Sequence, residues 1–244
     1  MKLPGALAAA LALIASLAQA EPRRSGFDDM SPAVQALQRD DTQNPAMLWV
    51  ADGQRRFAAD CATCHDAGAM RGVAARYPAF DGAAGRVINL AGRVNACRER
   101  HLKRPRWAPG SDELLAMETY LGHLSRGLPI APPADARLAP ARELGARLWR
   151  QRLGQLDLSC AQCHDAHAGR RLGGSLIPQG HPTAYPIYRL EWQGVGSLQR
   201  RLRGCQVGVR AEPWDWDSDE LLALEAFLMQ RAAGMALETP GVRP

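Results

Sequence analysis

Apolar residues recur at helical spacing near the end of each half of the chain. Residues 111–124 and 218–229 both begin with Ser-Asp-Glu, a start that caps a helix and suits its positive end. Behind these starts, one helical face carries Leu114, Met117, Leu121 and Leu124 in the first segment and Leu221, Leu224 and Leu228 in the second. Helices are also predicted over 46–60 and 141–156. Since no segment shows a continuous core-strand pattern, the sequence predicts an all-α protein.

The two halves repeat one another. Leu90-x-x-Arg93-x-x-x-Cys97 returns as Leu198-x-x-Arg201-x-x-x-Cys205. A repeat of this length indicates two tandem copies of one small domain. A proline-rich stretch separates the copies and is typical of a semi-rigid connector. We therefore predict an N-terminal domain over 21–130, a linker over 131–140 and a C-terminal domain over 141–244, with about nine extra residues of the second copy inside 173–196.

Residues 1–20 have the three parts of a secretory signal peptide. Lys2 precedes an apolar stretch over 5–17, and Ala18-Gln19-Ala20 forms a small-x-small cleavage site. The alternative is an uncleaved anchor or a buried helix. We expect export to the periplasm and no membrane span in the mature chain, because no later apolar run is long enough.

Charge says little about partners, whereas the cysteine content needs an explanation. The 244 residues carry 30 basic and 25 acidic side chains, a net charge of +5 without a continuous basic stripe, so nucleic acid is not a predicted partner. Six cysteines in an oxidising compartment would be expected to pair, unless they hold a ligand or perform chemistry.

Four of the cysteines lie in two Cys-x-x-Cys-His motifs, the attachment pattern of c-type haem. The thiols are Cys61 and Cys64 in the first motif and Cys160 and Cys163 in the second, each pair followed at once by His65 or His164. Two thiols three residues apart on a helical turn project to the same side, where they form thioethers with one ring, and the histidine then binds the iron. Zinc sites, redox dithiols and ordinary disulfides are the alternatives. We predict two covalent haems, each at the centre of a cytochrome c-like domain.

Each haem iron needs a second axial ligand. Met70 and His101 have no matching residue in the other half, and Met117 fits the apolar stripe of a helix. Cys97 and Cys205 do repeat, at equivalent positions upstream of the closing helix. We therefore predict His/Cys ligation of both irons. The alternative is a Cys97–Cys205 disulfide between the halves.

Arginines surround both of these cysteines. If the segments are helical, Arg93 and Arg201 share a face with the cysteine four residues later, where a guanidinium stabilises a thiolate or binds an oxyanion. The second segment is richer in cations, with Arg200, Arg203 and Arg210 close in sequence to Cys205 and Arg170 and Arg171 after the haem motif. Surface exposure or contact with haem propionates is the alternative for any one of them. As a group they favour a small anionic substrate.

The sequence resembles the SoxA family, the dihaem subunits of the SoxAX cytochromes of bacterial sulfur oxidation. The resemblance covers nearly the whole mature chain. It rests on the tandem haem motifs and the Arg-x-x-x-Cys segments, and it is most specific over 201–228. One departure is Gln206, where many members have asparagine.

The resemblance implies an L-cysteine S-thiosulfotransferase that couples thiosulfate oxidatively to a cysteine of a SoxYZ-like sulfur carrier and passes two electrons to cytochrome c. It implies that Cys205 is catalytic, an axial ligand opposite His164 and often a persulfide, with Arg201 as the substrate-binding arginine. In the first half it implies His65 and Cys97 as axial ligands. The implied partner is a SoxX-like monohaem cytochrome subunit.

Two other functions fit the same residues. One is a non-enzymatic dihaem electron carrier, in which thiolate ligation only lowers the haem potential. The other is a thiosulfate dehydrogenase that joins two thiosulfates to tetrathionate. The basic surroundings of Cys205 favour turnover of an anion over electron transfer alone.

Overall fold

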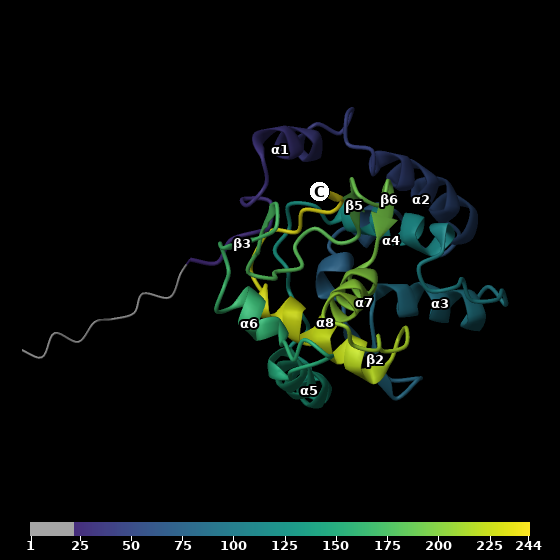
Figure 1. The fold of residues 1–244 in the computed structure, drawn as a ribbon. Helices are drawn as coiled ribbons and strands as arrows, with labels where there is room; N and C mark the ends of the chain where they lie inside the picture. Colours follow the sequence, from purple (N-terminus) through teal and green to yellow (C-terminus); the bar gives the residue numbers. More distant parts are fainter. Residues whose placement is uncertain (1–21) are drawn as a thin grey trace, which may run out of the picture.

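The computed structural model describes residues 22–244, so the predicted signal peptide lies outside the described residues. The first half contains α1 (Pro32–Arg39), α2 (Met47–Asp60), η1 (Gly68–Met70), η2 (Ala74–Arg76), β1 (Ala79–Asp81), β2 (Arg86–Ile88), α3 (Leu90–Arg100) and α4 (Asp112–Leu124). The second half contains η3 (Ala136–Leu138), α5 (Ala139–Arg150), α6 (Cys160–His164), β3 (Arg171–Leu172), β4 (Ser175–Leu176), β5 (Ile187–Arg189), β6 (Gly194–Gly196), α7 (Leu198–Gly208), α8 (Asp219–Arg231) and β7 (Gly241–Arg243). Helices dominate, as Figure 1 shows.

The two halves repeat the same succession of elements. A helix before the haem motif is followed by a short antiparallel hairpin, a helix with the lone cysteine, and a closing helix: α2, β1–β2, α3 and α4 in the first half, and α5, β5–β6, α7 and α8 in the second. The hairpins share one register, since Ala79 pairs with Ile88 and Ile187 with Gly196. The internal repeat predicted from the sequence is thus visible in the structure.

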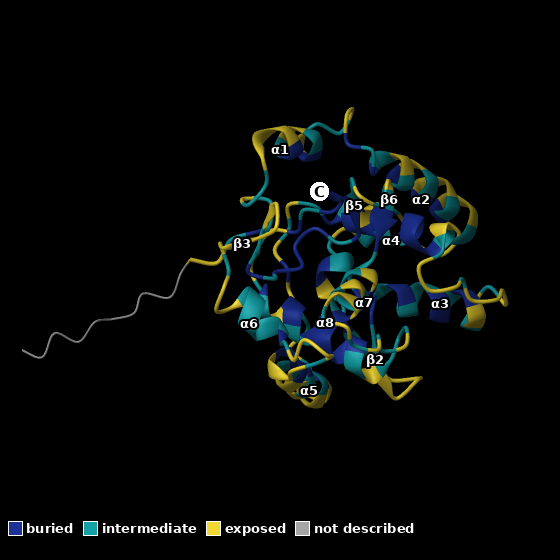
Figure 2. Ribbon diagram, in the orientation of Figure 1, coloured by how far each residue is buried: buried dark blue, intermediate teal, exposed yellow. Residues whose placement is uncertain are grey.

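Each closing helix packs against the helix that precedes the haem motif, α4 on α2 and α8 on α5. The helices meet at a glycine. A Cβ atom on Gly53 would overlap the carbonyl of Ala116, and one on Gly145 would overlap the carbonyl of Ala223. Such close backbone approach is open only to glycine. Figure 2 shows the result, with α4 and α8 largely buried and the outer faces of α2 and α5 exposed.

Both halves contribute to the hydrophobic core. One cluster joins Val34 and Leu115 of the first half to Tyr188 and Val242 of the second. The last strand, β7, pairs in parallel with β5, and α1 packs on β7. The C-terminus therefore lies beside the first helix (Figure 1). The domain boundaries at 131–140 remain a prediction.

The predicted helices over 46–60, 111–124 and 218–229 form, and Ser111 and Ser218 cap the closing helices as expected. The helix predicted over 141–156 is wrong at its end, because α5 stops at Arg150. Beyond it the chain turns through Gly154, at φ +67°, and Leu153 bridges to Leu158. The hairpins were not predicted, since three residues are too few to show an alternating pattern.

The extra residues of the second half lie earlier than expected. They fall between His164 and Tyr185, where the chain forms the β3–β4 hairpin and a buried loop, whereas 187–196 matches 79–88 of the first half. The predicted range 173–196 overlaps this interval but extends too far toward the C-terminus, because 187–196 has its counterpart in the first half. Among the described residues no helix is long and apolar enough to cross a membrane.

Candidate functional site

The second Cys-x-x-Cys-His motif forms a short helix of its own, α6. Ser159 accepts a hydrogen bond from the backbone N–H of Gln162 at 3.3 Å, and the Gln162 side chain accepts one from the backbone N–H of Ser159 at 2.8 Å. This capping box holds the single turn that places Cys160 and Cys163 three residues apart on one helix.

His164 is held in a defined orientation by its neighbours. Its Nδ1 is 2.7 Å from the carbonyl oxygen of Pro178, and its ring stacks on Trp149 with the centroids 5.6 Å apart. Burial lowers the pKa of His164, so the neutral imidazole is favoured. With Nδ1 donating to the carbonyl, Nε2 is the nitrogen left to bind a metal.

A cavity of about 530 Å³ opens beside this histidine and suits a large flat cofactor. Its walls include His164, Cys205 and Arg201, together with the apolar side chains Leu198, Leu202 and Leu228. Burial, followed by the charge on Cys205, raises the pKa of the Cys160 thiol to about 11. The structure thus brings an imidazole and a cysteine to one cavity, and Cys160 and Cys163 of the haem motif are not among its lining residues; these residue types fit a covalent haem.

Arg201 is a cation of this cavity that has no partner among the described residues. It precedes Cys205 by one turn on α7, as predicted, and both side chains line the cavity. Within residues 22–244 the Arg201 guanidinium makes no hydrogen bond or ion pair. Its donors are therefore available to an anion.

Of the other arginines predicted near Cys205, some line the cavity and some do not. Arg171 lines the cavity, but Arg170, Arg200, Arg203 and Arg210 do not. Arg200 stacks on Trp192, and Arg203 on Trp216. Only part of the predicted cluster therefore faces the site. Sequence reasoning missed Tyr185 and Arg189 of the cavity wall, which could have been found by extending the repeat alignment through Tyr77-Pro78 and Tyr185-Pro186.

The first motif is more open. Cys64 and His65 are exposed, and Cys61 ends α2. Burial, then the charges of Asp60 and Cys97, raise the pKa of the Cys61 thiol to about 11, which places Cys97 of α3 near the motif. The residue types match those of the second site, but His65 is exposed, unlike His164.

The alternatives for the cysteines are not supported. No disulfide joins any of the six cysteines within residues 22–244, and Cys97 and Cys205 lie on separate helices. Across residues 22–244 no three His, Cys, Asp or Glu side chains converge into a zinc-like site. Gln206, the departure from the family pattern, is buried and accepts a hydrogen bond from the backbone N–H of Trp214 at 3.3 Å.

Comparison with known proteins agrees with this geometry. The family described as SoxA/TsdA, cytochrome c domain, matches residues 46–130 and 144–237. The L-cysteine S-thiosulfotransferase subunit SoxA of Rhodovulum sulfidophilum is 32% identical over 229 residues, which cover 90% of this chain and 80% of that protein. The SoxA subunit of Paracoccus pantotrophus is 33% identical over 227 residues, 90% of this chain and 78% of that protein. The crystal structure of SoxXA from P. pantotrophus matches with a TM-score of 0.87 and 32% identity, over 91% of this chain and 87% of that one.

A repeated helical domain with one haem-binding motif per copy defines a c-type cytochrome, and its cofactor is covalently bound haem c. The chain belongs to the SoxA/TsdA cytochrome c family. The predicted fold class of two tandem cytochrome c-like domains is confirmed, and so is the resemblance found in the sequence.

Proposed function

We propose that this chain is the dihaem subunit of a SoxAX-type cytochrome and an L-cysteine S-thiosulfotransferase. It joins thiosulfate to a cysteine of a SoxYZ-like sulfur carrier and passes two electrons to a cytochrome c. The relatives with the same name cover most of the chain, and the matched structure is a SoxXA complex. A SoxX-like monohaem subunit is therefore the proposed partner.

One observation carries the proposal. The cysteine Cys205 and Arg201, whose guanidinium has no partner within residues 22–244, line the same cavity as the proposed haem ligand His164. An electron carrier has no need of a cation beside the cysteine of its haem pocket beyond those that neutralise the haem propionates. An enzyme that binds a dianion does need one.

Arg201, Cys205 and the haem-binding residues have different roles in the proposed reaction. Arg201 binds the anionic oxygens of thiosulfate through its planar donor fork. Cys205 is the sulfur that takes up the thiosulfate group before it passes to the carrier thiol. In the net reaction a sulfur–sulfur bond forms between thiosulfate and the carrier cysteine, the thiol releases one proton, and two electrons leave. The haem held by Cys160, Cys163, His164 and Cys205 would supply the electron sink.

The first half is assigned a second haem, with Cys61 and Cys64 as thioether positions and His65 and Cys97 as axial ligands. Arg93, the first-half counterpart of Arg201, is not free, since it contacts both Tyr77 and Asp81. We therefore assign this haem no part in binding thiosulfate. Export to the periplasm completes the proposal.

Arg201→Ala tests the function, with Arg93→Ala at the equivalent position as its control. Thiosulfate-dependent reduction of cytochrome c is followed with and without the carrier, and the carrier cysteine is examined by mass spectrometry. We expect a carrier-dependent rate and a thiosulfate adduct, both lost in Arg201→Ala and kept in Arg93→Ala. Reduction without carrier, with tetrathionate as product, would establish the dehydrogenase. If the unmodified protein shows no thiosulfate-dependent reduction of cytochrome c, the non-enzymatic electron carrier would be the function that remains.

A further inference from the structure

The two hairpins place residues of opposite charge at one equivalent position. Tyr77-Pro78 leads into β1 and Tyr185-Pro186 into β5. Asp81, the last residue of β1, pairs with the first residue of β2, as Arg189 of β5 does with the first of β6. The repeat therefore matches Asp81 to Arg189 in the same way that it matches Arg93 to Arg201.

In the first half this position holds a carboxylate that Arg93 shares with Arg100, whose Nη1 lies 2.8 Å from Oδ2 of Asp81. Arg93 Nη1 lies 3.6 Å from Oδ2 of Asp81, and Arg93 Nε donates to the Tyr77 hydroxyl at 3.1 Å. The Asp81 side chain is only 3% exposed, so its charge acts in a place with little solvent screening. The guanidinium of Arg93 is consequently paired within its own domain.

In the second half a cation replaces that carboxylate. Arg189 and Arg201 both line the large cavity, and burial followed by the charge of Arg201 lowers the pKa of Arg189. Two guanidinium groups that repel in a partly buried space are stabilised by an anion between them.

The contacts of Arg189 leave it able to bind that anion. Its Nε donates to the main-chain oxygen of Pro244 at 2.8 Å, and its Nη2 lies 3.1 Å from Oε1 of Glu191. The Glu191 side chain is 53% exposed, so water screens this ion pair. The Pro244 oxygen, Glu191 and the Trp192 ring, 5.1 Å from Cζ, orient the guanidinium, and none of the described residues forms a hydrogen bond or ion pair with Nη1.

We propose that Arg189 and Arg201 together bind one oxyanion group, and that the exchange of Asp81 for Arg189 confines anion binding to the second half. The ligand is the sulfonate end of thiosulfate or a haem propionate, since both present coplanar or clustered oxygens to a guanidinium fork. For thiosulfate the proposal rests on the function proposed above, and it adds a second substrate-binding residue to it.

The test uses the haem-loaded protein with its partner subunit. Arg189→Gln removes the charge, and Arg189→Asp recreates the Arg–Asp pairing of the first half. Arg200→Gln, an exposed arginine outside the cavity wall, is the control. Calorimetry gives the dissociation constant of thiosulfate without carrier present, and a redox titration gives the midpoint potential of each haem.

If the pair binds substrate, Arg189→Gln weakens thiosulfate binding by about tenfold or more, as loss of a charge-assisted hydrogen bond predicts. Arg189→Asp weakens it further, and the potentials stay unchanged. If the pair binds a propionate, the potential of one haem shifts while thiosulfate affinity is kept. Either result supports the oxyanion pair.

Unchanged affinity and potentials in both variants would overturn the proposal, as would an equal effect of Arg200→Gln. If Arg189→Asp fails to load haem, Arg189→Lys takes its place in the test. Because lysine keeps the positive charge, we expect this variant to bind the oxyanion within a few fold of the unmodified protein. Unmodified protein that binds thiosulfate but transfers nothing to the carrier would refute the proposed function alone.

Discussion

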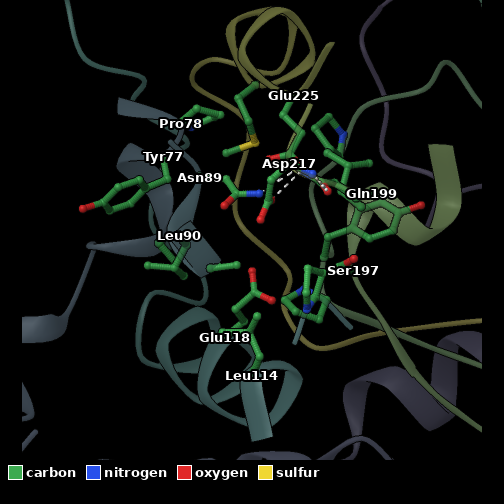
Figure 3. Close-up of a pocket in the computed structure, with 18 of the residues that line it drawn as sticks. Tyr77, Pro78, Asn89, Leu90, Leu114, Glu118, Ser197, Gln199, Asp217 and Glu225 are labelled. Carbon is green, nitrogen blue, oxygen red and sulfur yellow. Dashed lines mark hydrogen bonds between the residues drawn. The ribbon is translucent and has the colours of Figure 1, made fainter. Parts of the chain in front are cut away.

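Glu118 on α4 and Glu225 on α8 hold equivalent places in the two halves and line one cavity between them. Figure 3 shows both side chains there, with Asp217 and Asn89. The cavity encloses about 90 Å³, and Asn89 Nδ2 donates to Glu225 Oε1 across the interface at 3.2 Å. Burial, then the charge of Glu225, raises the pKa of Glu118 to about 8, and burial raises the pKa of Glu225 to about 7.

This pair predicts that stability falls with rising pH. The folded state keeps protons that the unfolded carboxyls, with ordinary pKa values near 4.5, release. Their contribution is therefore complete below about pH 4.5 and is lost as the pH rises through about 7 and 8. Glu118→Gln should remove part of this loss and stabilise the protein at pH 8, by an amount on the order of a few kcal/mol at most.

Thermal unfolding of the haem-loaded protein between pH 5 and 9, followed by circular dichroism, checks this prediction. Glu143→Gln on the exposed face of α5 is the control and should leave the pH dependence unchanged. Parallel curves for Glu118→Gln and the unmodified protein would contradict the assignment.

The glycines at the two helix crossings should tolerate no side chain. Gly53→Ala and Gly145→Ala each push a Cβ into a backbone carbonyl of the closing helix, and we expect a loss of about 2 kcal/mol or more from overpacking. Gly208→Ala on α7, where a Cβ meets nothing within 4 Å, is the matched control. Chemical denaturation measures all three, and equal stability would mean that the helices separate at little cost.

Gly180 should position His164. It has φ +75°, and a Cβ there would lie 2.9 Å from Trp149 and 3.3 Å from the His164 ring. Gly180→Ala therefore strains the backbone by about 1–2 kcal/mol and displaces the stacked rings. We expect a changed low-spin haem signal in electron paramagnetic resonance, with haem content retained. An unaltered spectrum would show that the loop moves away without disturbing the histidine.

Cys97→Ser should show that the two haems have different roles. Replacing a proposed thiolate ligand raises the potential of the first haem, by on the order of 0.1 V, since thiolates donate electron density to the iron. Thiosulfate coupling should persist, because the second site keeps Cys205. Redox titration and the carrier assay check the two parts, and loss of coupling at normal haem content would give the first haem a role in catalysis.

Local patterns were enough to predict much of this protein. The spacing of Cys160, Cys163 and His164 indicated haem attachment because it reflects one helical turn, and the serine caps located the closing helices. The lone cysteines Cys97 and Cys205 stood out through the repeat. These features depend on residues that are near one another in sequence, so helical spacing and residue type are enough to predict them.

Contacts between segments that are distant in sequence could not be predicted from such local patterns. The hairpins are too short to show a period, and the sequence did not indicate which of the arginines around Cys205 face the cavity. Nor did it reveal that Glu118 and Glu225 share a cavity, or that Arg189 replaces the carboxylate that neutralises Arg93 in the first half. The sequence by itself determined the cofactor chemistry, the repeat and the helices. Only the tertiary structure decided which charges are paired and which are left free, because burial and neighbouring groups from remote parts of the chain set the energy of a charge.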